Sequence, residues 1–347
     1  MKYKITFAYK GTAYAGWQRQ RNAVSVQEVL EAALGKLFGA PCSVTASGRT
    51  DAGVHAAGQV AHFNAETSIP HDKIPFAVNT LLPPDISVYA CEIAPEDFNA
   101  RFSAKRKTYS YSFYTSSHIN PLKNDLASHI PYALDLKEMR RAAAFMEGTH
   151  DFKCFEAAGS IVKNTVRTLY SLTVSRTPPL YYPSPAEFGQ KKSDAVKCYS
   201  SCGESAAYAS APHSPSMPEF GRENSCAGER PSSCGESAAY ASAPHSPSLP
   251  EFGRKKYAGE RPSSCGENDP CASAPSIRNL AGEDYQITVT GDGFLYNMVR
   301  IIAGTLVYVG MGKISSGDIP SVLLSRDRTR AGKTLPANGL TLVSVEY

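Results

Sequence analysis

The chain has 347 residues, of which 42% are hydrophobic and 20% charged, a composition typical of a globular protein with one large domain or two ordinary ones. Its formal net charge of +4 permits nucleic-acid binding without requiring it. The N-terminal residues contain no apolar core, and no run of about 18 apolar residues occurs, so we expect neither a signal peptide nor a membrane span. Nine irregularly spaced cysteines are expected to be free thiols, which predicts a cytoplasmic protein.

The first half of the chain, residues 1–104, predicts alternating strands and helices. Alternating apolar residues indicate a first strand at 3–9, and the capping box Ser25-Val26-Gln27-Glu28 begins a helix that reaches about Phe38. Further strands are expected at 42–46, 59–63 and 86–93, with a glycine-bounded segment at 48–58 and a short helix at 74–81. The predicted order is strand, helix, strand, strand, helix, strand.

The second half, residues 105–177 with 283–347, repeats this order. Strands are expected at 108–114, 169–174, 285–289 and 340–345, and helices are expected after Asp135 and over 294–309. Two split βαβ units, each ferredoxin-like in the order of its elements, therefore form an α+β core.

The stretch 178–282 differs in composition from both halves and is predicted to be an insertion between two strands. It is rich in Ser, Pro, Gly, Ala and Cys, and Glu-Phe-Gly recurs in it at 187–189, 219–221 and 251–253. The repeats offer no apolar face for stacking, which excludes a solenoid. We expect a disordered surface segment, because this composition cannot offset its ordering entropy. Metal binding by its Cys and His is the alternative, although no closely spaced pair of ligands supports it.

A polar, glycine-bounded segment joins two predicted strands of the first half. It reads Gly48-Arg49-Thr50-Asp51-Ala52-Gly53-Val54-His55. A bare hairpin turn is the simplest interpretation, but the segment carries more polar side chains than a turn requires. An aspartate on a rigid loop between central strands is well placed to face a cleft, so Asp51 is a candidate catalytic residue.

Arg300 is the single charged residue in the apolar segment 294–304. A partly buried guanidinium needs an anionic partner, and a carboxylate beside an arginine stays ionised and oriented, as a nucleophile must. A purely structural ion pair is the alternative.

Cations and aromatic residues occur together in the segment 101–109 and again after the first strand. The residues concerned are Arg101, Lys105, Arg106, Lys107 and Tyr109, together with Trp17 and Arg19. Cations neutralise phosphates and aromatic rings stack on unpaired bases, so this mixture favours RNA binding. The alternative is a solvated run of charges beside core tyrosines.

Taken together, these motifs resemble those of the tRNA pseudouridine synthase A family. The matching segments are 14–20, 25–28, 48–56, 98–104, 109–111, 297–300 and 327–340. Their order and spacing agree over residues 1–177 and 283–347, and the string from Gly48 to His55 is highly specific. The insertion departs from the family, which has a short loop there, and an insertion close to the cleft or to a dimer interface would impair activity.

The resemblance implies an isomerase that converts uridine to pseudouridine at positions 38, 39 and 40 of the tRNA anticodon stem-loop. It implies that Asp51 is the catalytic nucleophile, that Tyr109 contacts the target base and that Arg300 pairs with Asp51. Arg49 and the cations at 101–107 would bind phosphates. The family needs no metal or organic cofactor and works as a homodimer, each cleft being completed by the partner. The two halves would form one antiparallel sheet with the cleft between them.

Two other functions account for part of this pattern. An RNA-binding module of ferredoxin-like fold would show affinity without product, and it leaves the polar Asp51 loop and Arg300 unexplained. A hydrolase of the glycosidase type would need two close carboxylates, whereas the loop around Asp51 offers one.

Overall fold

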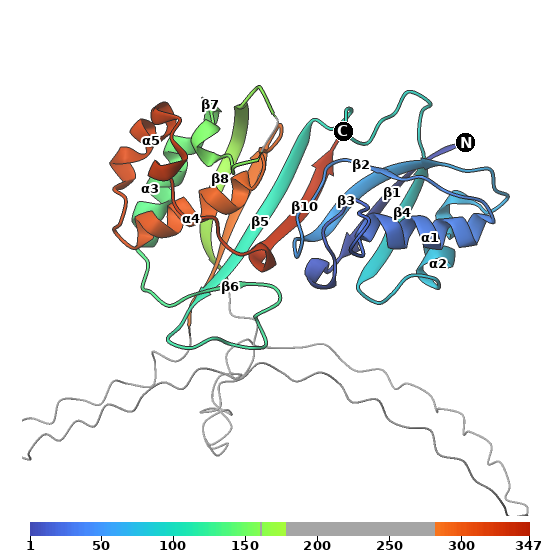
Figure 1. Cartoon of the computed structure of the whole chain (residues 1–347), viewed down its shortest axis with the longest axis horizontal. Coiled ribbons are helices and arrows are strands. Elements are labelled where there is room, and N and C mark those ends of the chain that lie inside the picture. Colours follow the sequence, from blue (N-terminus) through green and yellow to red (C-terminus); the bar gives the residue numbers. More distant parts are fainter. Residues whose placement is uncertain (160–161, 178–281) are drawn as a thin grey trace, which may run out of the picture. The chain divides into compact units, whose positions relative to one another are not determined.

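The computed structural model describes residues 1–159, 162–177 and 282–347, all of which belong to one compact unit (Figure 1). The predicted insertion at 178–282 lies outside the described residues except for Gly282, as do its expected disorder and the alternative of metal binding. Within the described residues, no helix has the length and apolar character needed to cross a bilayer.

A large, mostly antiparallel sheet forms the core of the unit. Its strands follow the order β4-β1-β3-β10-β5-β9-β8-β7, with β2 paired to β3 and β6 paired to β5. The strands are β1 (Lys2–Tyr9), β2 (Thr45–Ala46), β3 (His55–Asn64), β4 (Ile86–Ile93), β5 (Arg106–Thr115), β6 (Ser128–Ile130), β7 (Gly148–Asp151), β8 (Val166–Thr177), β9 (Asp284–Gly291) and β10 (Leu340–Glu346). The predicted mixed α+β class is therefore confirmed.

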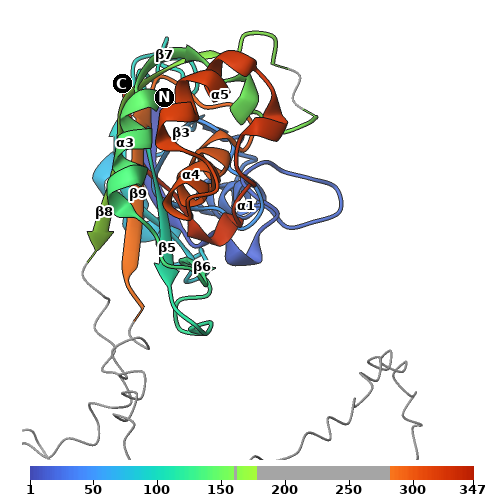
Figure 2. The same ribbon diagram turned by 90° about the vertical axis from the view of Figure 1, so that its left-hand side faces the viewer.

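Helices lie against the sheet and bury its apolar side chains. They are α1 (Val26–Phe38), α2 (Ile74–Asn79), α3 (Leu136–Met146), α4 (Met298–Gly310) and α5 (Ile319–Ser325). Figure 2 shows α1, α4 and α5 on the same side of β5, β8 and β9. The strict alternation of buried and half-buried residues along β1 and β9 agrees with a sheet that is packed mainly on one face.

The predicted helix starts are confirmed where a polar side chain caps the helix. The Ser25 hydroxyl accepts a hydrogen bond from the Glu28 amide (3.3 Å), and the Asp135 carboxylate accepts bonds from the amides of Lys137 and Glu138.

Several predicted boundaries were wrong, among them both ends of β8, which was predicted at 169–174, and short elements were missed. Helix α4 begins at Met298 rather than at about residue 294, because Asn297 adopts a left-handed conformation with φ of 58°. Strand β3 begins at His55, so the connecting segment ends earlier than residue 58, and β2 is shorter than the predicted 42–46. The elements β6, β7 and α5 were not predicted; the two strands have only three and four residues, too few for a clear periodic pattern.

The two halves of the sheet meet along β3. Near its start, β3 pairs in parallel with β10 through His55 and Ala56, whereas near its end the same strand pairs with β2 through Ala61 and His62. Strands β2 and β10 thus belong to different halves and pair with different stretches of β3. The connection between β2 and β3, residues 47–54, runs at this seam.

Candidate active site

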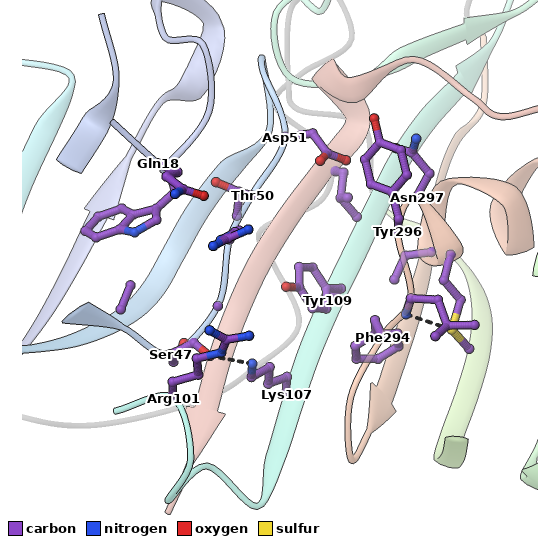
Figure 3. Close-up of a pocket in the computed structure, with 18 of the residues that line it drawn as sticks. Gln18, Ser47, Thr50, Asp51, Arg101, Lys107, Tyr109, Phe294, Tyr296 and Asn297 are labelled. Carbon is purple, nitrogen blue, oxygen red and sulfur yellow. Dashed lines mark hydrogen bonds between the residues drawn. The ribbon is translucent and has the colours of Figure 1, made fainter. Parts of the chain in front are cut away.

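A cleft of about 680 Å³ opens at the seam (Figure 3). Its walls come from segments far apart in the sequence, namely residues 44–51, 294–299 and the start of β5, with Leu340 at the beginning of β10. The predicted site residues Asp51 and Tyr109 both line it. The fold therefore brings together residues that the sequence separates by up to 323 positions, from Trp17 to Leu340.

A tight turn presents Asp51 to the cleft. The Val54 amide donates to the Asp51 carbonyl (3.1 Å), which closes the turn, and Gly53 within it has φ of +79°. A left-handed residue of this kind favours glycine, which lacks the Cβ that strains this conformation. The Asp51 side chain is 35% exposed and faces the cleft (Figure 3).

The segment after β1 holds the Asp51 loop from behind. The Trp17 amide donates to the Thr50 carbonyl (3.0 Å), and the Thr50 hydroxyl is bonded to the buried Tyr9 hydroxyl (2.8 Å). Gly16, with φ of +87°, approaches so closely that a Cβ there would lie 2.5 Å from the Thr50 carbonyl oxygen. The contacts at the Thr50 carbonyl and the bond from its side chain to Tyr9 therefore fix the position of the neighbouring Asp51.

Arg300 lies beside Asp51, with its Nη1 atom 3.7 Å from the Asp51 Oδ2 atom. Burial raises the pKa of Asp51, and the positive charge of Arg300 partly offsets this by lowering the pKa. The arrangement keeps a half-buried carboxylate next to a fixed positive charge that favours its ionised form.

Arg300 is oriented by two neutral acceptors that the sequence argument did not foresee. Its Nε atom donates to the Leu335 carbonyl and its Nη1 atom donates to the Asn297 side-chain oxygen, both at 2.7 Å. The Leu335 amide donates in return to the Arg300 carbonyl (3.3 Å). The guanidinium is thus satisfied mainly by hydrogen bonds, and its contact with Asp51 is longer than these bonds.

The segment 331–335, which carries Leu335, is packed directly on helix α4. A Cβ on Gly304 would lie 1.8 Å from the Lys333 carbonyl oxygen, and the Gly332 amide donates to the Thr305 hydroxyl (2.8 Å). The sequence places this segment within the family match at 327–340, but it does not indicate that Leu335 contacts Arg300. The local sign of the close packing is the glycine inside helix α4.

Tyr109 lies on β5 in the wall of the cleft. Its side chain is 8% exposed, and its ring packs edge-on against Phe294 with a centroid separation of 5.0 Å. The Tyr109 hydroxyl has no hydrogen-bond partner among the described residues, and Figure 3 shows it directed toward the middle of the cleft. Burial raises the pKa of Tyr109 well above its usual value, so the phenol is neutral.

The predicted RNA-contacting cations fall into two groups. Arg49, Arg101 and Lys107 line the cleft, and the first two are exposed. Lys105 and Arg106 are not among the lining residues, and the Arg106 guanidinium lies over the ring of Tyr170, 4.7 Å from its centroid.

Trp17 and Arg19 also differ in their surroundings. Trp17 is 4% exposed and packs against Phe7 with a ring separation of 5.5 Å, so its ring is mainly part of the core beneath the cleft. Arg19 is exposed and pairs with Glu31 at 3.5 Å. Within the part of the chain that the structure describes, no three His, Cys, Asp or Glu side chains are grouped as metal ligands would be.

Comparison with known proteins gives a consistent result. A family model described as tRNA pseudouridine synthase matches residues 5–103 and 269–347. The chain is 35% identical over 346 residues to the tRNA pseudouridine synthase A of Ruminiclostridium cellulolyticum, covering 100% of this chain and 99% of that protein. It is 34% identical over 349 residues to the protein of the same name from Bacillus subtilis (strain 168), with coverage of 100% and 99%.

Proposed function

Because the chain belongs to the tRNA pseudouridine synthase A family, isomerases that convert uridine to pseudouridine in tRNA, we propose that Asp51 is its nucleophile and that its targets are uridines 38, 39 and 40 of the anticodon stem-loop. The observation that carries the assignment of the site is the cleft at the seam of the sheet. There the half-buried Asp51 carboxylate lies beside the Arg300 guanidinium and shares the cleft with the Tyr109 ring.

The reaction needs an ionised carboxylate near the sugar. The bond between C1′ and N1 breaks, the uracil turns, and C5 bonds to C1′ while the C5 proton is lost and N1 gains one, so that the product is an isomer. The Asp51 carboxylate either attacks C1′ or removes a sugar proton to assist elimination of the base. Both routes require the deprotonated form, which the positive charge of Arg300 favours against the effect of burial.

Tyr109 is suited to hold the uracil while it is detached from the sugar. A target base must leave its stack to reach the cleft, and an aromatic wall stabilises it there. The ring of Tyr109 is fixed edge-on by Phe294, so it offers a preformed surface. The neutral phenol hydroxyl, which has no partner among the described residues, is free to bond to a uracil carbonyl. Arg49, Arg101 and Lys107 would bind backbone phosphates around the cleft.

We also propose that residues 1–104 and residues 105–177 with 283–347 are two ferredoxin-like halves. In the first half the strands lie in the order β4-β1-β3-β2, and in the second half they lie in the order β10-β5-β9-β8. In both orders the first strand of the half, β1 or β5, lies between the fourth and the third strands of that half, as in a ferredoxin-like unit. The proposed assembly is a homodimer in which the partner helps to form each cleft. The proposed location is the cytoplasm, and the proposed partner there is the tRNA substrate.

The test is formation of pseudouridine in unmodified tRNA by the full-length protein. Tritium placed at C5 of uridine is released to water when C5 bonds to C1′, so its release measures turnover. Asp51→Asn keeps the shape of the side chain and should abolish release while tRNA binding persists. Product formed at wild-type rate by that variant would overturn the role of Asp51. Transcripts with cytidine at positions 38, 39 and 40 should release no tritium, and release from them would refute the proposed target positions.

A further inference from the structure

Asn297 combines an unusual backbone conformation with a side chain in the wall of the cleft. Its φ of 58° makes it one of two residues other than glycine with a left-handed backbone in the part of the chain that the structure describes. Asparagine tolerates this conformation better than most residues, but the conformation is still costly. Strained residues of this kind cluster at functional sites, and Asn297 is half-buried and lines the cleft.

Hydrogen bonds on both sides of Asn297 hold this backbone in place. The Met298 amide donates to the Leu295 carbonyl (3.1 Å), and the Ile301 amide donates to the Asn297 carbonyl (3.0 Å), which begins helix α4. The Asn297 side chain makes no capping bond to the helix that it precedes. The carboxamide therefore serves something other than the start of α4.

The contact with Arg300 determines which way round the Asn297 carboxamide lies. A guanidinium can only donate, so the Asn297 atom that lies 2.7 Å from the Arg300 Nη1 atom must be the oxygen, Oδ1. The other end of the carboxamide is then the Nδ2 amino group, which carries two N–H donors. These donors have no acceptor among the described residues, although the side chain lines the cleft.

The same Arg300 atom places Asn297 next to Asp51. Nη1 lies 2.7 Å from the Asn297 Oδ1 atom and 3.7 Å from the Asp51 Oδ2 atom, so the two oxygens are separated by no more than the sum of these distances. Figure 3 shows Asn297 at the Asp51 end of the cleft, with Tyr109 farther along it. The Nδ2 donors therefore lie close to the carboxylate that acts on the sugar.

We propose that Asn297 is a catalytic residue whose Nδ2 atom donates a hydrogen bond to O2 of the target uracil as the base leaves the sugar. The inference rests on the proposed function, which supplies the substrate. When the bond between C1′ and N1 breaks, its electron pair goes to the uracil, and the negative charge spreads over N1 and the carbonyl oxygens. This happens in either route open to Asp51. A fixed N–H donor at O2 stabilises the developing charge without having to reorganise.

One donor at this position serves both ends of the isomerisation. In uridine the carbonyl next to the glycosidic bond is C2–O2, whereas in pseudouridine it is C4–O4, because C5 replaces N1 as the atom bonded to C1′. A donor fixed beside the sugar therefore meets an acceptor in the substrate and again in the product. Tyr109, farther along the cleft, is left to contact the carbonyl on the far side of the base.

The experiment is a cycle between substrate and protein. Single-turnover tritium release is measured with the full-length protein on tRNA transcripts that carry uridine or 2-thiouridine at position 39, because sulfur accepts hydrogen bonds more weakly than oxygen. The sulfur should slow the wild type about tenfold more than it slows Asn297→Gly, which keeps the left-handed backbone and lacks the donor. The variant also loses the bond to Arg300, but this loss affects both substrates and cancels in the ratio.

Asn64→Gly is the matched control, because Asn64 is exposed and lies outside the cleft, and it should keep the wild-type ratio. Equal rate ratios in all three proteins would overturn the proposal. A dependence on Asn297 that appears with 2′-deoxyuridine in place of 2-thiouridine would assign the contact to the ribose hydroxyl, and it would also overturn the assignment to O2.

A second variant covers the case in which Asn297→Gly does not fold or has no measurable turnover. Asn297→Asp retains an oxygen for Arg300 and offers no N–H donor, so it takes the same place in the cycle. The ratio of Kd values for the two transcripts, measured in the Asp51→Asn background, makes the comparison without turnover, and a ratio unaffected by the change at Asn297 refutes the contact. Failure of the wild type to form any pseudouridine would instead refute the proposed function itself.

Discussion

Replacing Arg300 by methionine tests whether this arginine keeps Asp51 ionised. Methionine retains an apolar stem in helix α4 and removes the positive charge that lies 3.7 Å from the Asp51 Oδ2 atom. At that separation the attraction is about 1 kcal/mol in water and about 4.5 kcal/mol at an effective dielectric constant near 20. The two side chains are 18% and 35% exposed, so solvent screens the pair. We expect the lost attraction to amount to about 2 kcal/mol, which corresponds to roughly a 30-fold loss of rate at the acid end of the pH profile.

The sign of the pH dependence follows from the two opposing effects on Asp51. Burial raises its pKa and Arg300 lowers it, so removing Arg300 leaves burial unopposed. The carboxylate is then protonated up to a higher pH, and the acid limb of the pH–rate profile moves upward. The rate deficit of the variant should be largest at low pH and should shrink as the pH rises.

Single-turnover release of tritium from C5, measured from pH 5 to 9, isolates the chemical step. Arg300→Lys keeps the charge and loses the paired bonds to Leu335 and Asn297, so it should lose rate with a smaller shift of the acid limb. Arg140→Met is the control, because Arg140 donates to the Val174 carbonyl outside the cleft. An acid limb that stays in place in Arg300→Met, with a deficit constant across the range, would refute the electrostatic role.

Two further predictions concern the loop that carries Asp51 and the strand that follows it. Gly16→Ala should lower the free energy of unfolding by about 1–3 kcal/mol and slow turnover, because it places a Cβ on a left-handed backbone position against the Thr50 carbonyl. Gly312→Ala is the control, since position 312 also has a left-handed backbone but open space around it, and this variant should keep full turnover. Chemical denaturation and tritium release measure the two effects, and equal turnover of both variants would contradict the argument. Burial lowers the pKa of His55 below 6.5, because the folded protein favours the neutral ring. The contribution of His55 to stability is therefore fully present above pH 6.5 and is lost as the pH falls below this value. His55→Gln, which has no titrating group, should show a smaller fall in Tm from pH 7 to 5 than the wild type, and parallel curves would count against the prediction.

Local signals in the sequence predicted the regular elements well where a single physical cause dominated. The polar caps at Ser25 and Asp135 marked helix starts, and alternation predicted the strand Ile86–Ile93 at its observed bounds. The start of α4 was misplaced because the apolar pattern continues through Asn297, whose left-handed backbone ends the preceding turn. The start of β3 was misplaced because its first residues pair with Thr341 and Leu342 of β10, a contact that no local pattern reveals.

The candidate site was predictable in its charged members and in Tyr109, which lines the cleft as an aromatic residue beside the run of cations. Asp51 stood out as an acid in a polar loop and Arg300 as a charge in an apolar segment, and both inferences rest on the cost of burying charge. The acceptor of Arg300 was not predictable, because it is the backbone carbonyl of Leu335, and any residue type offers one. Lys107 was one cation in a run of four until the pairing of β5 with β9 and β10 determined which of them faces the cleft.

The position of the insertion follows from the same sheet. Strands β8 and β9 pair from Leu169 and Gly291 at one end to Thr177 and Asp284 at the other, with one irregularity near Leu169. The inserted residues join the sheet at the Thr177 end, whereas Phe294 and the other cleft residues follow β9 at the Gly291 end, a strand length of about 23 Å away. The pairing continues up to the point of attachment. The chain between β8 and β9 therefore leaves the sheet at the end opposite the cleft residues that follow β9, and the two strands remain paired between these ends.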